Sequence, residues 1–126
     1  MYVYFNDNPV GSRVGDCAVR AISKALGISW EEAYAKLIVN GFRMGDMPSS
    51  NNVIASVLRM NGFKRKNLPE ECPECFTVAD FARKYPKGTY ILGTGNRVVT
   101  VINGNWYDSW DSADENPQYF WYRERR

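Results

Sequence analysis

The 126-residue sequence contains no histidine, the side chain that most often acts as a general base near neutral pH. Its absence excludes zinc sites built on histidine and Cys–His or Ser–His catalysis. The three cysteines are an odd number, which fits free thiols better than a disulfide framework. No segment approaches the roughly 18 apolar residues of a membrane span, and the N-terminus lacks the pattern of a signal peptide. We therefore expect a cytoplasmic protein with no membrane partner.

Composition and charge are those of an ordinary globular protein. Hydrophobic residues make up 44% of the chain and charged residues 24%, and its length is typical of one domain. We predict a single domain spanning residues 1–126. The formal net charge of +2 is too small to indicate a nucleic-acid partner. The basic C-terminus, residues 123–126, is interpreted as a solvated tail.

The first two thirds of the chain favour helices. Ser29 and Glu32 have the spacing of a capping box, which marks the start of a helix. Gly27 and Gly41 stand where the first two helices are expected to stop, and Thr77 is placed to cap a short one. The predicted helices cover residues 16–26, 30–41, 51–60 and a short segment after residue 77.

Towards the C-terminus the pattern changes to that of strands. Asn103-Gly104 is the dipeptide favoured in a type I′ hairpin, and it joins predicted strands at residues 97–102 and 106–110. Further strands are predicted at residues 2–5, 63–66, 90–92 and 119–122, the first of them at a sheet edge. The many aromatic side chains of the C-terminal strands are interpreted as core packing. Helices followed by an antiparallel sheet indicate the α+β class.

Cys17 falls at the N-terminus of the first predicted helix, directly after Gly15 and Asp16. The positive end of the helix dipole and its free N–H groups favour a thiolate there, which makes the sulfur a nucleophile. The backbone N–H of Cys17 would also point towards an oxyanion formed on an attacked carbonyl. The same position equally suits a buried structural cysteine.

The predicted hairpin brings a charged pair onto one of its faces. With a two-residue turn at 103–104, residue 99 lies opposite Asp108 and Arg97 lies opposite Trp110. Arg97 and Asp108 are then diagonal neighbours. Taken alone, such a pair also fits an ordinary surface ion pair worth under about 1 kcal/mol.

Together, these motifs resemble those of papain-like cysteine peptidases, in particular small phage and bacterial members related to bacteriocin-processing peptidases. The family's nucleophile motif, Gly-Asp-Cys at the start of a helix, is similar to residues 15–22, which read GDCAVRAI. The family's base opens a strand in a pattern like His-Val-Val-x-Val-Ile-x-Gly, followed by Tyr-Asp-x-Trp-Asp. Here residues 97–104 read RVVTVING and residues 107–111 read YDSWD. The resemblance spans roughly residues 4–122 and implies a papain-like fold, with N-terminal helices packed on a C-terminal antiparallel sheet.

The chain departs from the family at the base, because Arg97 stands where the histidine is expected. In the family that histidine takes a proton from the cysteine and later gives one to the leaving group. A guanidinium stays protonated at any ordinary pH, so Arg97 can only favour a thiolate and attract anions. Asp108, which by the resemblance would orient the histidine, would pair with Arg97 instead. A natural pseudoenzyme and an introduced inactivating change both fit this pattern.

By the same resemblance, an oxyanion-hole side chain comes from the loop before the cysteine. Asn8 and Ser12 are the candidates, with Asn8 preferred, although both residue types also form turns. Cys72 and Cys75 form a CxxC pair, but a zinc site needs two more ligands and only Cys17 remains. A labile disulfide or a metal shared across a dimer is the alternative use of that pair. Because the chain cannot supply four zinc ligands by itself, we expect neither metal nor cofactor.

The resemblance implies a cysteine peptidase that cleaves amide or isopeptide bonds through Cys17 and is impaired by Arg97. The rival interpretation is a pseudo-peptidase that binds a peptide tail or a host protein in the same cleft. A small interaction protein unrelated to peptidases is a third. The expected partner is a peptide or protein in a bacterial or phage-infected cytoplasm, and the sequence favours no oligomeric state.

Overall fold

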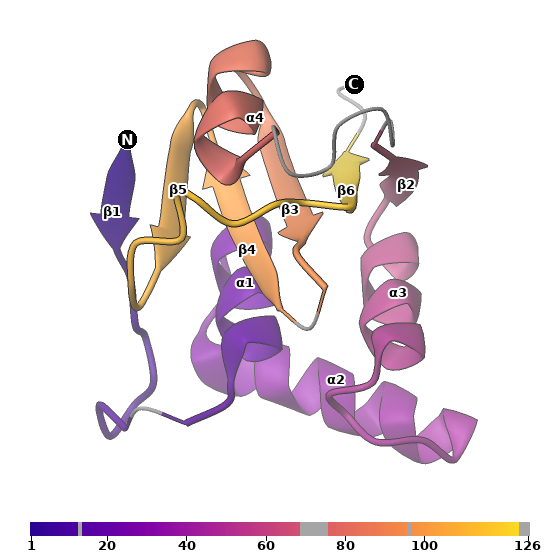
Figure 1. The fold of residues 1–126 in the computed structure, drawn as a ribbon. Helices are drawn as coiled ribbons and strands as arrows, with labels where there is room; N and C mark the ends of the chain where they lie inside the picture. The colour runs from indigo at the N-terminus through magenta and orange to yellow at the C-terminus, as the bar shows by residue number, and fades with distance from the viewer. Residues whose placement is uncertain (13, 69–75, 96, 124–126) are drawn as a thin grey trace.

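The computed structural model describes residues 1–126 except residues 13, 69–75, 96 and 124–126 (Figure 1). The helices are α1 (Cys17–Leu26), α2 (Trp30–Met44), α3 (Asn51–Met60) and α4 (Val78–Lys84). The strands are β1 (Tyr2–Tyr4), β2 (Phe63–Asn67), β3 (Thr89–Gly93), β4 (Val98–Ile102), β5 (Asn105–Asp108) and β6 (Tyr119–Arg123). This mixture of helices with one sheet is compatible with the predicted α+β class.

The strands form one sheet in the order β1-β5-β4-β3-β6-β2. All neighbouring pairs are antiparallel except β1 and β5, which run parallel. The predicted edge position of β1 is confirmed, but the prediction of a wholly antiparallel sheet is wrong at this edge. The chain passes through α1 to α4 and the strands β2, β3 and β4 between β1 and β5, so no tight turn imposes an antiparallel direction on them.

Helices cover both faces of the sheet (Figure 1). α1 packs against β4, and α2 and α3 extend the helical layer on that side. Ile91 and Trp121 point into this layer, whereas their strand neighbours Leu92 and Phe120 point into the core under α4. This alternation follows from the pleat of a strand. The expected packing of N-terminal helices on the sheet therefore describes α1 to α3, while α4 lies on the opposite face.

The local turn and cap signals are confirmed. Ser29 caps α2 through the reciprocal bonds with Glu32, and Thr77 and Asp80 form a second capping box on α4. Asn103 and Gly104 have φ values of 49° and 80°, as a type I′ turn requires. The pairing of Ile102 with Asn105 gives the predicted hairpin register.

Two predicted ends are wrong. α2 continues past Gly41 to Met44 and stops at Gly45, which has the left-handed φ of 67° typical of a helix end. Gly41 serves close packing instead, because a Cβ there would lie 2.8 Å from the carbonyl oxygen of Asp46. β5 ends at Asp108 rather than at residue 110. At this end, the Asp108 carboxylate accepts the N–H of the next residue, Ser109, at 2.7 Å.

The C-terminal residues differ from the expected tail in one respect: Arg123 is the last residue of β6 and pairs with Phe63 of β2. β1 lies at one edge of the sheet, and β6 lies next to β2 at the other edge (Figure 1). Among the described residues, none of the helices combines the length and apolar character needed to cross a bilayer.

Candidate functional site

Cys17 is the first residue of α1, as the sequence predicted, and its free thiol is half-buried. It packs against the apolar cluster formed by α1, α2, α3 and the sheet. Asp16 precedes it at the N-cap position, but the Asp16 side chain makes no capping bond to the helix. The carboxylate of Asp16 instead contacts side chains of α1 and α2.

Asp16 joins α1 to α2. Its Oδ2 accepts the indole N–H of Trp30 at 2.9 Å, and its Oδ1 pairs with the guanidinium of Arg20 one turn along α1. Asp16 and Arg20 are each only 6% exposed. Sequence reasoning missed Arg20, although its position four residues after Asp16 is the spacing of an ion pair on a helix. No comparable local pattern pointed to Trp30.

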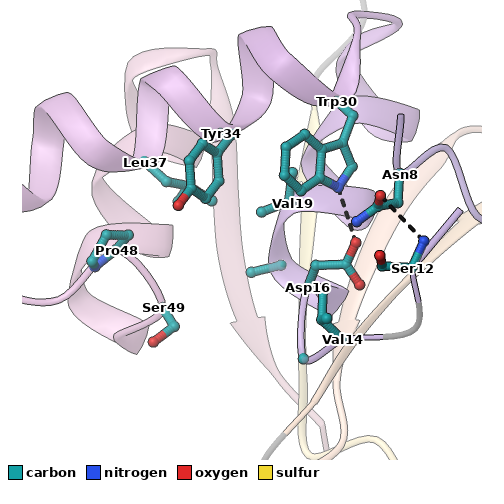
Figure 2. A pocket seen from close by; sticks show the side chains of 12 residues that line it. Asn8, Ser12, Val14, Asp16, Val19, Trp30, Tyr34, Leu37, Pro48 and Ser49 are labelled. Atoms are coloured by element: carbon teal, nitrogen blue, oxygen red, sulfur yellow. Dashed lines mark hydrogen bonds between the residues drawn. The ribbon is translucent and has the colours of Figure 1, made fainter. Parts of the chain in front are cut away.

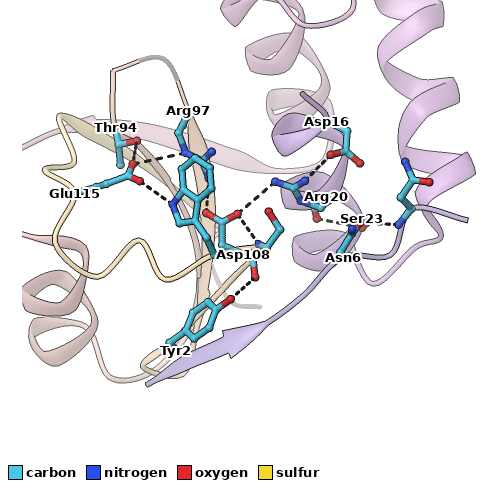
Figure 3. A network of polar contacts seen from close by, with 12 residues as sticks. Tyr2, Asn6, Asp16, Arg20, Ser23, Thr94, Arg97, Asp108 and Glu115 are labelled. Atoms are coloured by element: carbon cyan, nitrogen blue, oxygen red, sulfur yellow. Dashed lines mark hydrogen bonds and ion pairs between the residues drawn. The ribbon is translucent and has the colours of Figure 1, made fainter. Parts of the chain in front are cut away.

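Asp108, at the end of β5, lies between two arginines (Figure 3). Its Oδ1 is 3.3 Å from Nη2 of Arg20, and its Oδ2 is 2.5 Å from Nη2 of Arg97. Only 3% of Asp108 is exposed. The predicted pairing of Arg97 with Asp108 is thus present, and Arg20 extends it across the interface between the sheet and α1.

Arg97 is held on three sides. Beyond Asp108, its Nε lies 3.7 Å from Oε1 of Glu115, and its guanidinium carbon lies 3.9 Å from the centre of the Trp110 ring. Glu115 also accepts hydrogen bonds from the Trp110 indole at 3.2 Å and the Thr94 hydroxyl at 2.9 Å. Glu115 was not identified from the sequence because it lies on an irregular segment with no motif. Trp110, expected in the core, is 51% exposed and stacks on Arg97.

The chain of contacts from Asp16 through Arg20, Asp108 and Arg97 to Glu115 contains three carboxylates and two guanidiniums. Its formal charge is therefore −1. The positive charge of Arg97 is matched by two neighbouring carboxylates, so Arg97 does not by itself make this site attractive to anions. The contacts thus connect the start of α1, next to Cys17, to Arg97 before β4.

A cavity of about 340 Å³ opens beside the start of α1 (Figure 2). The neighbours of Cys17 in sequence, Gly15, Asp16 and Ala18, contribute to its wall. Most of the remaining wall is apolar or aromatic, and Trp30 and Tyr34 stack within it at a ring separation of 5.0 Å. The other lining residues are Asn8, Ser12, Val14, Val19, Leu37, Pro48 and Ser49.

Asn8 and Ser12, the candidates for an oxyanion hole, both line this cavity. The Asn8 side-chain oxygen accepts the N–H groups of Val10 at 3.0 Å and Ser12 at 3.3 Å. Asn8 therefore shapes its loop in the way a turn-forming asparagine does. A role for its amide in binding an oxyanion stays a prediction.

The CxxC pair, Cys72 and Cys75, lies outside the described residues. Within the described part of the chain, no group of three or more Cys, Asp or Glu side chains is arranged to hold a metal ion. Comparison with protein-family models, curated proteins and solved structures found no match to this chain.

Proposed function

We propose that this chain is a papain-like cysteine peptidase domain that has lost turnover and binds an extended peptide segment of another protein in the former substrate cleft. The observation that carries the proposal is the setting of Arg97. At the position where the resemblance predicts the base, the guanidinium of Arg97 contacts Asp108, Glu115 and Trp110. A guanidinium does not exchange its proton near neutral pH, so it cannot act as a base.

The loss of a base affects the two halves of the reaction differently. Cys17 at the helix start can still attack a carbonyl, with backbone N–H groups to receive the developing charge. The proton for the leaving group and the activation of water both require a group that exchanges protons near neutral pH. Arg97 does neither, so the expected outcome is binding, with at most slow acylation and little release.

The cavity next to Cys17 supports peptide binding. Its walls are mainly apolar, its volume suits one or two side chains, and the sequence neighbours of Cys17 line it, although Cys17 itself does not. Tyr34 is 44% exposed at its rim, so this ring is accessible to a partner. We therefore expect the bound segment to place an apolar side chain against Trp30 and Tyr34.

A peptide array with single leucine or phenylalanine residues in polar sequences tests the proposal, followed by Kd measurements on the best binders. Tyr34→Ala is expected to weaken binding about 10-fold, as truncation of an interface aromatic commonly does. Tyr4→Ala, at a tyrosine that is 56% exposed on β1, is the matched control. Cys17→Ala is expected to bind normally. Cys17-dependent turnover by the unmodified chain, or equal effects of Tyr34→Ala and Tyr4→Ala, would overturn it.

A further inference from the structure

Three arginines gather where β2, β6 and the end of α3 meet, at the sheet edge opposite β1. The guanidinium of Arg65 lies 4.0 Å from the centre of the Tyr119 ring. Those of Arg123 and Arg59 lie over Phe63 and Trp121 at 4.7 and 5.2 Å. All three arginines are exposed. Each is thus held by its stem and ring contact while its N–H groups face solvent.

None of these three arginines forms an ion pair with another described residue, in contrast to Arg20 and Arg97. A guanidinium stacked on a ring still has its in-plane N–H donors available, and these match the two oxygens of a carboxylate. A purely structural role for these arginines would be to cover aromatic residues at the rim of the core. That role does not explain why these three lack an acidic partner among the described residues, whereas Arg20, Arg83 and Arg97 each have one.

The strand register places Arg65 and Arg123 on one face of the edge. Arg65 pairs with Trp121, and Phe63 pairs with Arg123. Phe63 and Trp121 point into the core cluster that includes α3, so the two arginines share that face with them. Arg59, in the last turn of α3, lies over the same Trp121 ring.

β2 also offers an open backbone edge. In the described part of the sheet it pairs with β6 alone. Leu68 donates to Gln118 at 3.0 Å, directly continuing the register of the pair. Because backbone groups alternate in an antiparallel ladder, the even-numbered residues of β2 face β6. The N–H and C=O groups of Phe63, Arg65 and Asn67 therefore point outward, where a further strand could pair with them.

We propose that the open edge of β2 binds an acidic peptide segment as an added strand, with carboxylates at alternate positions facing the three arginines. Main-chain hydrogen bonds supply affinity in this mode and alternate side chains supply specificity. A second copy of β2 is disfavoured because it would set arginine and lysine against arginine and lysine. Nucleic acid is disfavoured because Phe63 and Trp121 are buried under the guanidiniums, which leaves these rings no free face for a base.

The test uses three synthetic peptides. The first alternates Glu with Val and Thr, and the second has the same composition with its Glu residues consecutive. The third is the alternating peptide with N-methylated amides on the edge that would pair with β2. We expect the first to bind, with the amide signals of residues 63, 65 and 67 shifting and becoming protected from hydrogen exchange. The other two should bind at least 10-fold more weakly. Arg65→Gln should weaken the first peptide about 10-fold, whereas Arg43→Gln, at an exposed arginine of α2, should leave it unchanged.

Several results would overturn the proposal. Equal binding of the alternating and consecutive peptides, or no effect of N-methylation, would indicate diffuse charge attraction instead of strand addition. Equal effects of Arg65→Gln and Arg43→Gln would do the same. Tighter binding of a single-stranded oligonucleotide would assign the patch to nucleic acid. Tyr34→Ala should not alter peptide binding at β2, so failure here and failure of the proposed cleft function are separable.

Discussion

Under the proposed function, the difference between arginine and histidine at position 97 decides whether Cys17 has a proton acceptor. The surroundings that a histidine would need are partly present: Asp108 is buried at hydrogen-bond distance from residue 97, and the Trp110 ring covers the side chain. Asp108 is also held by Arg20 and by the N–H of Ser109. Its carboxylate would therefore stay in place if residue 97 changed.

The substitution Arg97→His tests this directly. We expect Cys17-dependent peptide hydrolysis to rise by about 10²–10⁴-fold, the usual contribution of general acid–base catalysis. The measurement is kcat/KM on a panel of peptide and ubiquitin-like substrates. Arg97→Gln, which removes the charge without adding a base, and Arg97→His combined with Cys17→Ala are the controls and should show no gain. An equal gain with Arg97→Gln would show that removal of the arginine, rather than the new base, is what matters.

Among the elements, those with local signals in the sequence were predicted well. The capping boxes on α2 and α4 and the Asn103-Gly104 hairpin depend on residues a few positions apart, so their chemistry is visible in the sequence. The end of α2 was not predicted correctly. The glycine at position 41 is required because Asp46 approaches closely, and not because the helix ends there. The direction of β1 and the face covered by α4 depend on contacts far apart in the chain, which no local pattern encodes.

The capping box of α4 gives a prediction about pH. The backbone N–H of Thr77, followed by the Thr77 hydroxyl, lowers the pKa of Asp80 below its ordinary value of 3.8. A carboxyl whose pKa is lower in the folded protein than in the unfolded chain stabilises the fold at pH values above its unfolded-state pKa. That contribution is lost as the pH falls through its folded-state pKa. Asp80→Ala should therefore lower the Tm by a few degrees at pH 7 and by less in strong acid.

Thermal melts of the unmodified chain and of Asp80→Ala at pH 7 and at about pH 2 would measure this difference. Asp114→Ala, at an exposed carboxylate in a turn outside the helices and strands, is the matched control and should change the Tm little at either pH. A Tm difference for Asp80→Ala that stayed constant between the two pH values would show that the lost bond does not depend on the charge of Asp80.

At the scale of the whole molecule, the candidate site is built where the helical layer meets the sheet. The Arg97–Asp108 pair could be predicted because both residues belong to one hairpin. Arg20 and Glu115 could not, since Arg20 lies 88 residues from Asp108 and reaches it only after α1 has packed on the sheet. The sequence therefore indicated Cys17 and the Arg97–Asp108 pair, but not the contacts of Arg20 that connect Asp108 to Asp16.

Arg20 connects α1 to the sheet through ion pairs with Asp16 and Asp108, so its removal should affect both carboxylates. Arg20→Met leaves the buried carboxylates of Asp16 and Asp108 each with one fewer partner. We expect the free energy of unfolding to fall by about 3 kcal/mol, the low end for a broken buried pair, because Trp30 and Arg97 still bind these carboxylates.

A double-mutant cycle with urea unfolding separates the bridge from the packing of the Arg20 stem. Arg20→Met and Asp108→Asn together should cost about 1–3 kcal/mol less than the sum of the two single changes, as expected for groups in one network. Arg20→Met with Asp114→Asn should be additive within about 0.5 kcal/mol, because Asp114 is exposed and outside the network. Additivity in the first pair would mean that Arg20 stabilises the protein through its apolar stem. The connection between α1 and β5 would then run through packing rather than through charge.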